Sequence, residues 1–134
     1  MGSAFECFLT IFLFTLLAVK GDAQACDFKD MSIETQKTNR QVKGKPEWDV
    51  KVQNNCALNC PQYNVVVSCN NFQSVEKIDP DLFRFAGDNI YLVAAGGYFG
   101  PHAQIVFSYA WDFAFDIKPY SSKIRCPGFM GSDD

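Results

Sequence analysis

Residues 46–69, PEWDVKVQNNCALNCPQYNVVVSC, hold two stretches of alternating side chains joined by a short connection that carries cysteines. In the first stretch, Trp48, Val50 and Val52 alternate with polar residues. In the second, one face collects Tyr63, Val65, Val67 and Cys69. Alternation with a period of two is typical of a strand that is buried on one side. We therefore expect two β-strands here, with Cys56 and Cys60 between them.

The rest of the chain repeats this pattern in shorter form. Apolar runs separated by glycine, proline and asparagine turns lie at residues 26–36, 75–78, 82–85, 90–95, 103–111 and 113–117. Pro119 and the pair Ser121-Ser122 are expected to end the last of these strands. No stretch has a sustained helical period with caps. Seven or eight short strands in about 100 residues indicate an all-β fold, a compact antiparallel β-sandwich.

The N-terminal segment has a different composition. Residues 8–19, FLTIFLFTLLAV, are almost wholly apolar, but twelve residues span only ~18 Å as a helix, which is shorter than a ~30 Å hydrocarbon core. Small residues follow at Ala23-Gln24-Ala25, where a signal peptidase cleaves. The sequence therefore predicts a signal peptide over residues 1–25 and a secreted, extracellular domain over residues 26–134. A signal anchor is the alternative, because no basic residue precedes the apolar run.

The charge of the secreted domain is slightly negative. Removal of Lys20, Glu6 and Asp22 leaves eleven basic and thirteen acidic residues, a net charge of −2. Nucleic-acid and membrane-surface binding need an excess of positive charge, so neither is expected. No second apolar run is long enough to span a bilayer, so we expect no stable membrane insertion after cleavage.

Cleavage would remove Cys7 and leave an odd number of cysteines: Cys26, Cys56, Cys60, Cys69 and Cys126. Domains of this size bury too little surface to be very stable, and the secretory pathway allows disulfides to form. Two bridges and one leftover thiol can be arranged in fifteen ways. We expect one bridge to join a terminal cysteine, Cys26 or Cys126, to the group at residues 56–69. The leftover is either a buried thiol or the link of a covalent dimer.

No constellation points to a metal, a cofactor or catalysis. Zinc sites show tight cysteine pairs twice over, and only Cys56-x3-Cys60 is present. The single histidine, His102, would need a nucleophile to act as a catalytic base, and no serine lies in a G-x-S-x-G motif. Asp79-Pro80-Asp81 has the D-x-D pattern with which many glycosyltransferases hold a metal-bound nucleotide sugar, but its proline favours a turn. The glycine-rich residues 96–100 are not followed by the lysine of a phosphate-binding loop. We expect a protein without cofactors that is not an enzyme.

Two segments are candidates for contact with a partner. Residues 37–45, KTNRQVKGK, form a polar loop in this interpretation, either a solvated connection or a surface for an acidic partner through Lys37, Arg40, Lys43 and Lys45. The second segment is the glycine-rich turn at 96–101, whose Tyr98 and Phe99 are expected to be exposed. Aromatic residues could instead form a sugar-stacking platform, from Trp48, Tyr98, Phe99, Trp111 and Tyr120, although the two tryptophans lie within expected strands and favour the core.

An ordered set of motifs runs through nearly the whole domain. It comprises Cys26, Gln36-x-Thr38, Gly44-x-Pro46-x-Trp48-x-Val50-x-Val52-x-Asn54, Cys56-x3-Cys60, Cys69-x2-Phe72-x-Ser74, Asp79-Pro80, Leu92-Val93, Phe107-x-Tyr109-Ala110-Trp111-Asp112, Pro119-x-Ser121-Ser122 and Cys126. This set resembles the plant tapetum-determinant-like family of small secreted cysteine-rich proteins, some of whose members are named β-1,3-N-acetylglucosaminyltransferase family protein.

The resemblance implies an extracellular ligand, acting in the apoplast, that is recognised by a leucine-rich-repeat receptor kinase and directs cell fate in the anther. The residues here do not support the transferase name. Two departures stand out: Tyr91 replaces a cysteine that members often carry before Leu92-Val93, and Asn39 replaces glycine after Thr38. The first accounts for the odd cysteine count. A cell-wall carbohydrate-binding module is the alternative function.

Overall fold

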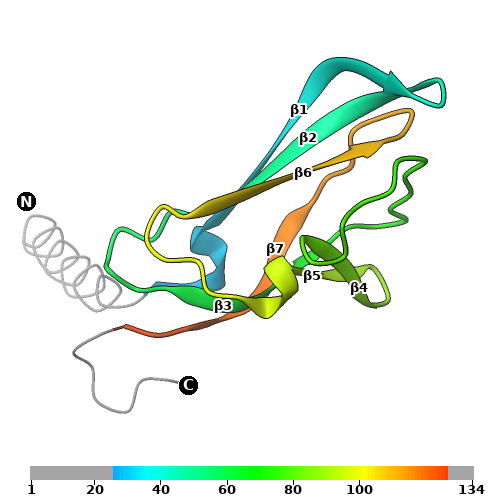
Figure 1. Cartoon of the computed structure of the whole chain (residues 1–134). Helices are drawn as coiled ribbons and strands as arrows, with labels where there is room; N and C mark the ends of the chain where they lie inside the picture. The colour runs from blue at the N-terminus through cyan, green and yellow to red at the C-terminus, as the bar shows by residue number, and fades with distance from the viewer. Residues whose placement is uncertain (1–25, 127–134) are drawn as a thin grey trace, which may run out of the picture.

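The computed structural model describes residues 26–126 and arranges them as two antiparallel sheets that face each other (Figure 1). The expected signal peptide, residues 1–25, and the tail, residues 127–134, lie outside the described residues. The strands are β1 (Met31–Val42), β2 (Lys45–Asn54), β3 (Gln62–Ser68), β4 (Phe83–Gly87), β5 (Ile90–Val93), β6 (Gln104–Ala110) and β7 (Lys118–Ile124). Two short 3-10 turns, η1 (Phe28–Asp30) and η2 (Ala94–Gly96), complete the elements.

The sheets have three and four strands, in the orders β1-β2-β6 and β4-β5-β3-β7. All strand pairs are antiparallel. The two long alternating stretches of the sequence thus become the central strands of opposite layers, β2 in one sheet and β3 in the other. The expectation of an all-β, disulfide-linked sandwich is confirmed, with seven strands in the described part of the chain.

The core lies between the sheets and follows the alternation of the sequence. Val50 and Val52 of β2 and Val65 and Val67 of β3 are at most 1% exposed. Full burial of such side chains contributes roughly 1.5–3 kcal/mol each. Aromatic rings also contribute to this core. Their centroids lie 4.4–5.5 Å apart in contacts among Phe72, Phe83, Tyr91, Phe107, Tyr109 and Phe115. Aromatic contacts at this spacing add to the stabilisation from area alone.

One residue interrupts the alternation of β3. Asn64 adopts a left-handed conformation, with φ 50°, and the pairing of β3 with β7 shifts register between Tyr63 and Val66. Such a bulge moves the preceding side chain to the other face of the sheet. Val65, Val67 and Cys69 are buried as expected, whereas Tyr63 is only half-buried. The prediction that Tyr63 shares their face is therefore wrong.

Two of the apolar runs also differ from expectation. Residues 75–78 and 113–117 form no strand. The segment 113–117 connects β6 of one sheet to β7 of the other. It buries the side chains of Phe115 and Ile117. The backbone N–H of Phe115 donates to the Tyr109 hydroxyl at 2.8 Å. The side chains of this segment alternate in burial because the segment crosses from one sheet to the other, not because it forms a strand.

Strand β7 contains Pro119, Ser121 and Ser122, which were expected to end the preceding strand. This strand lies at the edge of its sheet and pairs only with β3, so Pro119 can occupy it without breaking a ladder on a second side. Within residues 26–126, none of the helical turns has the length and apolar character needed to cross a membrane.

Candidate functional site

The basic segment, residues 37–45, is the outer end of the β1–β2 hairpin, which projects beyond the rest of the sandwich in Figure 1. The prediction of a loop is wrong here. Lys43 and Gly44 form a two-residue turn with φ values of 51° and 80°, and Val42 pairs with Lys45. Positive φ at both central residues is the geometry that matches the twist of a hairpin. We call this segment the basic hairpin.

Two of the four cations of the basic hairpin are occupied within the molecule. Arg40 forms an ion pair with Glu47. Lys45 Nζ lies 2.8 Å from Asp112 Oδ1 and 5.3 Å from the ring centroid of Trp111. Lys37 and Lys43 are exposed and form no ion pair among residues 26–126. The freely presented charge of the hairpin is therefore that of Lys37 and Lys43.

Beneath Arg40, two carboxyl groups meet. Glu47 is 2% exposed and accepts a hydrogen bond from the Thr38 hydroxyl at 3.0 Å. Glu76, from the loop after β3, has one carboxyl oxygen that is buried without a hydrogen-bond partner. Two ionised carboxylates have no proton to share, but a protonated Glu76 can donate to Glu47. Burial, followed by the hydrogen bond and charge of Glu47, raises the pKa of Glu76 to about 7.

The aromatic turn, residues 96–102, presents a different pair of rings from the one expected. Tyr98 is 59% exposed, but Phe99 is 2% exposed, and its backbone pairs with Gln62. The prediction that Phe99 is exposed is wrong because this backbone pairing turns its side chain into the core. Tyr98 instead stacks on Tyr63 at 4.7 Å between ring centroids. Sequence reasoning missed Tyr63, although asparagine inside a strand was a signal for the bulge that turns it outward.

The structure does not place the other aromatic residues of the expected sugar platform beside the stacked rings of Tyr63 and Tyr98. Trp48 is half-buried in β2, and its indole N–H donates to the Trp111 carbonyl at 3.2 Å. Trp111 is half-buried just after β6 rather than within a strand. Tyr120, on β7, is exposed. The stacked rings of Tyr63 and Tyr98 are the part of that platform that the structure brings together.

The basic hairpin and the aromatic turn lie at opposite ends of β2. Lys45 begins the strand, while Asn54 ends it and accepts a backbone hydrogen bond from His102 of the aromatic turn, at 2.9 Å. A ten-residue strand is about 30 Å long. The two candidate surfaces therefore form two separate contact regions.

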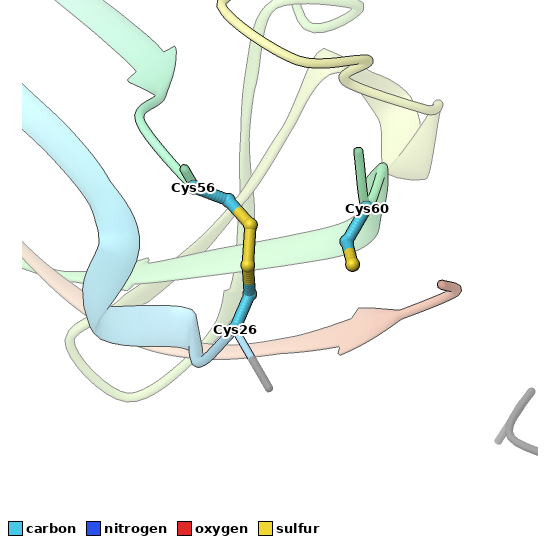
Figure 2. A group of neighbouring side chains, drawn as sticks. All are labelled: Cys26, Cys56 and Cys60. Carbon is cyan, nitrogen blue, oxygen red and sulfur yellow. A yellow bond between two sulfur atoms is a disulfide. The ribbon is translucent and has the colours of Figure 1, made fainter. Parts of the chain in front are cut away.

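Both disulfides lie at the aromatic-turn end of β2. Cys26 bonds to Cys56 and Cys60 bonds to Cys126, with Cα atoms 5.7 and 4.3 Å apart. Each bridge joins one end of the described chain to the connection between β2 and β3, as expected for at least one of them. Figure 2 shows the Cys60 side chain beside the Cys26–Cys56 bridge.

A buried amide positions this connection. Asn54 is fully buried, and its side-chain nitrogen donates to the carbonyls of Cys60 and Phe99 at 3.1 and 3.0 Å. Its oxygen accepts from the backbone N–H of Cys56 at 3.1 Å and from Gln62 at 3.3 Å. One side chain therefore fixes the backbones of two bridged cysteines and the aromatic turn.

The sulfur atoms of Cys26, Cys56 and Cys60 lie within 4.8 Å of one another, a spacing that a metal ion could use. Metal ligation requires thiolates, and these sulfurs are joined in disulfides. In this oxidised form the cluster does not offer a metal site.

Cys69 is the cysteine left without a bridge among residues 26–126. It is 1% exposed, and burial, with a smaller contribution from Asp116, raises the pKa of its thiol to about 11. This position fits the buried-thiol alternative. A covalent dimer through Cys69 would require the sandwich to open.

The motifs considered for catalysis have structural roles. Asp79 Oδ1 accepts from the backbone N–H of Asp81 at 2.9 Å, and Asp81 lies 3.5 Å from Arg84, so the Asp79-Pro80-Asp81 motif caps a turn. His102 is exposed with φ 63°, and its carbonyl accepts from Gln53 at 3.2 Å.

Comparison with known proteins assigns the family. The family model "Tapetum determinant 1, C-terminal" matches residues 27–126. The chain belongs to the tapetum determinant 1 family. The family resemblance inferred from the motif set is thus confirmed, and the matched region coincides almost completely with the disulfide-linked sandwich.

Two curated relatives are similar to this family member. TPD1 protein homolog 1B of Oryza sativa subsp. japonica is 31% identical over 93 residues, which is 69% of this chain and 54% of the relative. TPD1 protein homolog 1 of Arabidopsis thaliana is 31% identical over 95 residues, 71% of this chain and 53% of the relative. The chain thus spans about half the length of these relatives. No solved structure matches.

Proposed function

We propose that this tapetum determinant 1 family member is a secreted, non-enzymatic signalling protein that binds the ectodomain of a plant leucine-rich-repeat receptor kinase in cell-fate specification, including that of the anther. The observation that carries the proposal is the family match over residues 27–126. The two disulfides and the signal-like N-terminal segment support an extracellular, apoplastic location.

The shape of the domain suits a receptor ligand. A rigid sandwich with both described ends bridged to one connection presents an ordered surface, which limits the entropy lost on binding. The basic hairpin offers a projecting contact through Lys37 and Lys43, whose charges are not used inside the described domain. An acidic patch on the concave face of a repeat solenoid is the complementary surface that we propose.

The test is binding of the secreted, oxidised protein to a panel of plant leucine-rich-repeat receptor ectodomains, with wall polysaccharides as a parallel arm. We expect saturable binding to an ectodomain that is lost on reduction. The double variant Lys37→Glu/Lys43→Glu should weaken this binding roughly three- to thirtyfold and lower its salt dependence. Arg40 is a poor choice for charge reversal because the change would leave buried Glu47 unpaired.

Lys123→Glu is a control for the change of charge, since Lys123 is exposed on β7 in the other sheet. If the hairpin variant and the control bind equally well, the basic hairpin is not the contact. If no ectodomain binds, the receptor-ligand proposal fails.

A specific observation favours carbohydrate binding as the second candidate function. Tyr63 and Tyr98 stack on the surface, with Tyr98 59% exposed, and flat aromatic faces are the surfaces on which sugar rings pack. Retention on insoluble wall polysaccharide that falls with Tyr98→Ala, without ectodomain binding, would support this function. Tyr120→Ala, at an exposed ring outside the stacked pair, is its matched control.

A further inference from the structure

The two disulfides are close enough to react with each other. The sulfurs of Cys26, Cys56 and Cys60 lie mutually within 4.8 Å, although they belong to two different bridges. Disulfides rearrange when a thiolate attacks a sulfur of another bridge. Cys60 lies beside the Cys26–Cys56 bond (Figure 2).

We propose that Cys60 is a shared disulfide partner, and that reduction of the Cys60–Cys126 bond is followed by internal exchange to a Cys26–Cys60 bond. The N-terminal bridge would then move from Cys56 to Cys60, while the C-terminal end of the domain is released. This inference does not depend on the identity of the receptor.

The steps balance with a dithiol reductant such as dithiothreitol. Its two thiols reduce the Cys60–Cys126 bond to two protein thiols, and the reductant becomes a cyclic disulfide. Cys60 then loses its proton to solvent, and its thiolate attacks Cys26 Sγ. The Cys26–Cys60 bond forms as the Cys26–Cys56 bond breaks, and Cys56 leaves as a thiolate that takes up a proton. The exchange itself transfers no net electrons.

The direction of exchange follows from access to the two sulfurs of the Cys26–Cys56 bond. Cys56 is 1% exposed, whereas Cys26 is half-buried. Exchange rates depend on which sulfur is attacked and on access to it. Attack on Cys26 with departure of Cys56 is therefore favoured over the reverse.

The backbone around the three sulfurs keeps them together after reduction. Asn54 holds the Cys60 carbonyl and the Cys56 N–H. The side chain of buried Gln62 donates to the Asp27 carbonyl at 3.1 Å, which tethers the residue after Cys26 to the same site. Loss of one bridge thus leaves Cys60 near its new partner. Cys69 does not compete, since it is outside the cluster of three neighbouring sulfurs and the pKa of its thiol is raised to about 11.

The test compares two variants of the full chain produced through a secretory pathway. Cys126→Ser leaves Cys60 as a thiol beside the Cys26–Cys56 bond. Cys60→Ser/Cys126→Ser removes the same bridge together with the attacking sulfur. After incubation from pH 6 to 8, acid quenching and alkylation, trypsin and chymotrypsin separate the cysteines by cleaving after Leu58 and Tyr63, and mass spectrometry identifies the linked peptides.

We expect the single variant to gain a Cys26–Cys60 peptide and an alkylated Cys56, at a rate that rises with pH because the thiolate is the attacking species. The double variant should keep its Cys26–Cys56 peptide throughout. Two results would overturn the proposal: a single variant that retains Cys26–Cys56 as fully as the double variant, or one that forms Cys56–Cys60 instead.

A second arm uses the unaltered chain and covers the case in which the single variant does not fold. Limited dithiothreitol treatment yields species that have lost one bridge, which are separated by chromatography and mapped in the same way. A Cys26–Cys60 peptide with alkylated Cys56 and Cys126 supports the proposal. Species that contain only Cys26–Cys56 or Cys60–Cys126 contradict it.

Discussion

At the level of single residues, the most unusual electrostatic arrangement is the carboxyl pair under the basic hairpin. Glu47 and Glu76 share a partly dry site with Arg40, and Asp49 adds a further negative charge. The single guanidinium cannot neutralise both carboxylates. Burial and the neighbouring Glu47 therefore favour the protonated form of Glu76.

This arrangement predicts a pH-dependent stability. The Glu76 pKa rises from 4.5 to about 7 on folding, so below pH 4.5 its contribution is fully present. Between pH 4.5 and 7 the folded state holds a proton that the unfolded chain has lost, and the free energy of unfolding falls as pH rises, by at most about 3 kcal/mol. Glu76→Gln should flatten this slope. Urea unfolding at pH 5, 6 and 7.5 measures it.

Other carboxylates titrate in the same experiment, so the comparison is between the Glu76→Gln variant and the unaltered protein. Glu34→Gln is the matched control because Glu34 is exposed on β1, away from the carboxyl pair, and lies 3.4 Å from Lys51 of β2. Equal pH slopes for the unaltered protein and Glu76→Gln would show that Glu76 is already ionised in the folded state.

At the level of elements, the strand predictions were correct where apolar and polar residues alternate without interruption. Strand β6 falls within one residue of its expected bounds, β2 contains the whole expected alternation, and Val65 and Val67 of β3 are buried as predicted. The failures have a common cause, because alternation reports burial and not hydrogen bonding. Residues 113–117 alternate in burial without pairing, whereas β7 pairs without an alternating pattern.

The same reasoning explains what was missed at the candidate sites. The basic residues and Tyr98 were identified from composition and turn signals, which are local. The burial of Phe99 depends on its pairing with Gln62, and the exposure of Tyr63 depends on the bulge at Asn64. The first is a contact between distant segments and the second a local backbone conformation, and neither can be read from a periodic pattern of apolar residues. Likewise, the cysteine spacing left the pairing open, since it is decided by which strand ends are neighbours: Met31 of β1 pairs with Asn54 of β2, and Gln62 of β3 pairs with Ile124 of β7.

The bulge itself gives a prediction. Asn64→Val places a β-branched residue at φ 50°, which costs about 1–3 kcal/mol. Asn64→Gly is the matched control, because glycine adopts this conformation freely and should lose less than about 1 kcal/mol. Thermal unfolding monitored by circular dichroism measures both. Equal losses in the two variants would mean that the Asn64 side chain, and not its backbone conformation, stabilises the bulge.

At the level of the whole molecule, the two bridges divide the chain into consecutive loops. The Cys26–Cys56 loop has a sequence separation of 30 and the Cys60–Cys126 loop one of 66. They do not overlap, but they close at the same place, beside Asn54 and the aromatic turn. Cys26, Cys126 and the β2–β3 connection are thereby held at one end of the sandwich, and the basic hairpin at the other end is free to face a partner.

Non-overlapping loops should stabilise the fold additively. Chain-entropy estimates give about 3.5 kcal/mol for the shorter loop and about 4.5 kcal/mol for the longer one. We expect Cys26→Ser/Cys56→Ser to lower the free energy of unfolding by roughly the first amount and Cys60→Ser/Cys126→Ser by roughly the second, as measured by urea unfolding. Pairwise removal leaves no attacking thiol in the sulfur cluster, so these values are free of exchange. A smaller loss for the longer loop would show that β7 is held mainly by its pairing with β3, and that releasing the C-terminal bridge alters the end of the chain without loosening the sandwich.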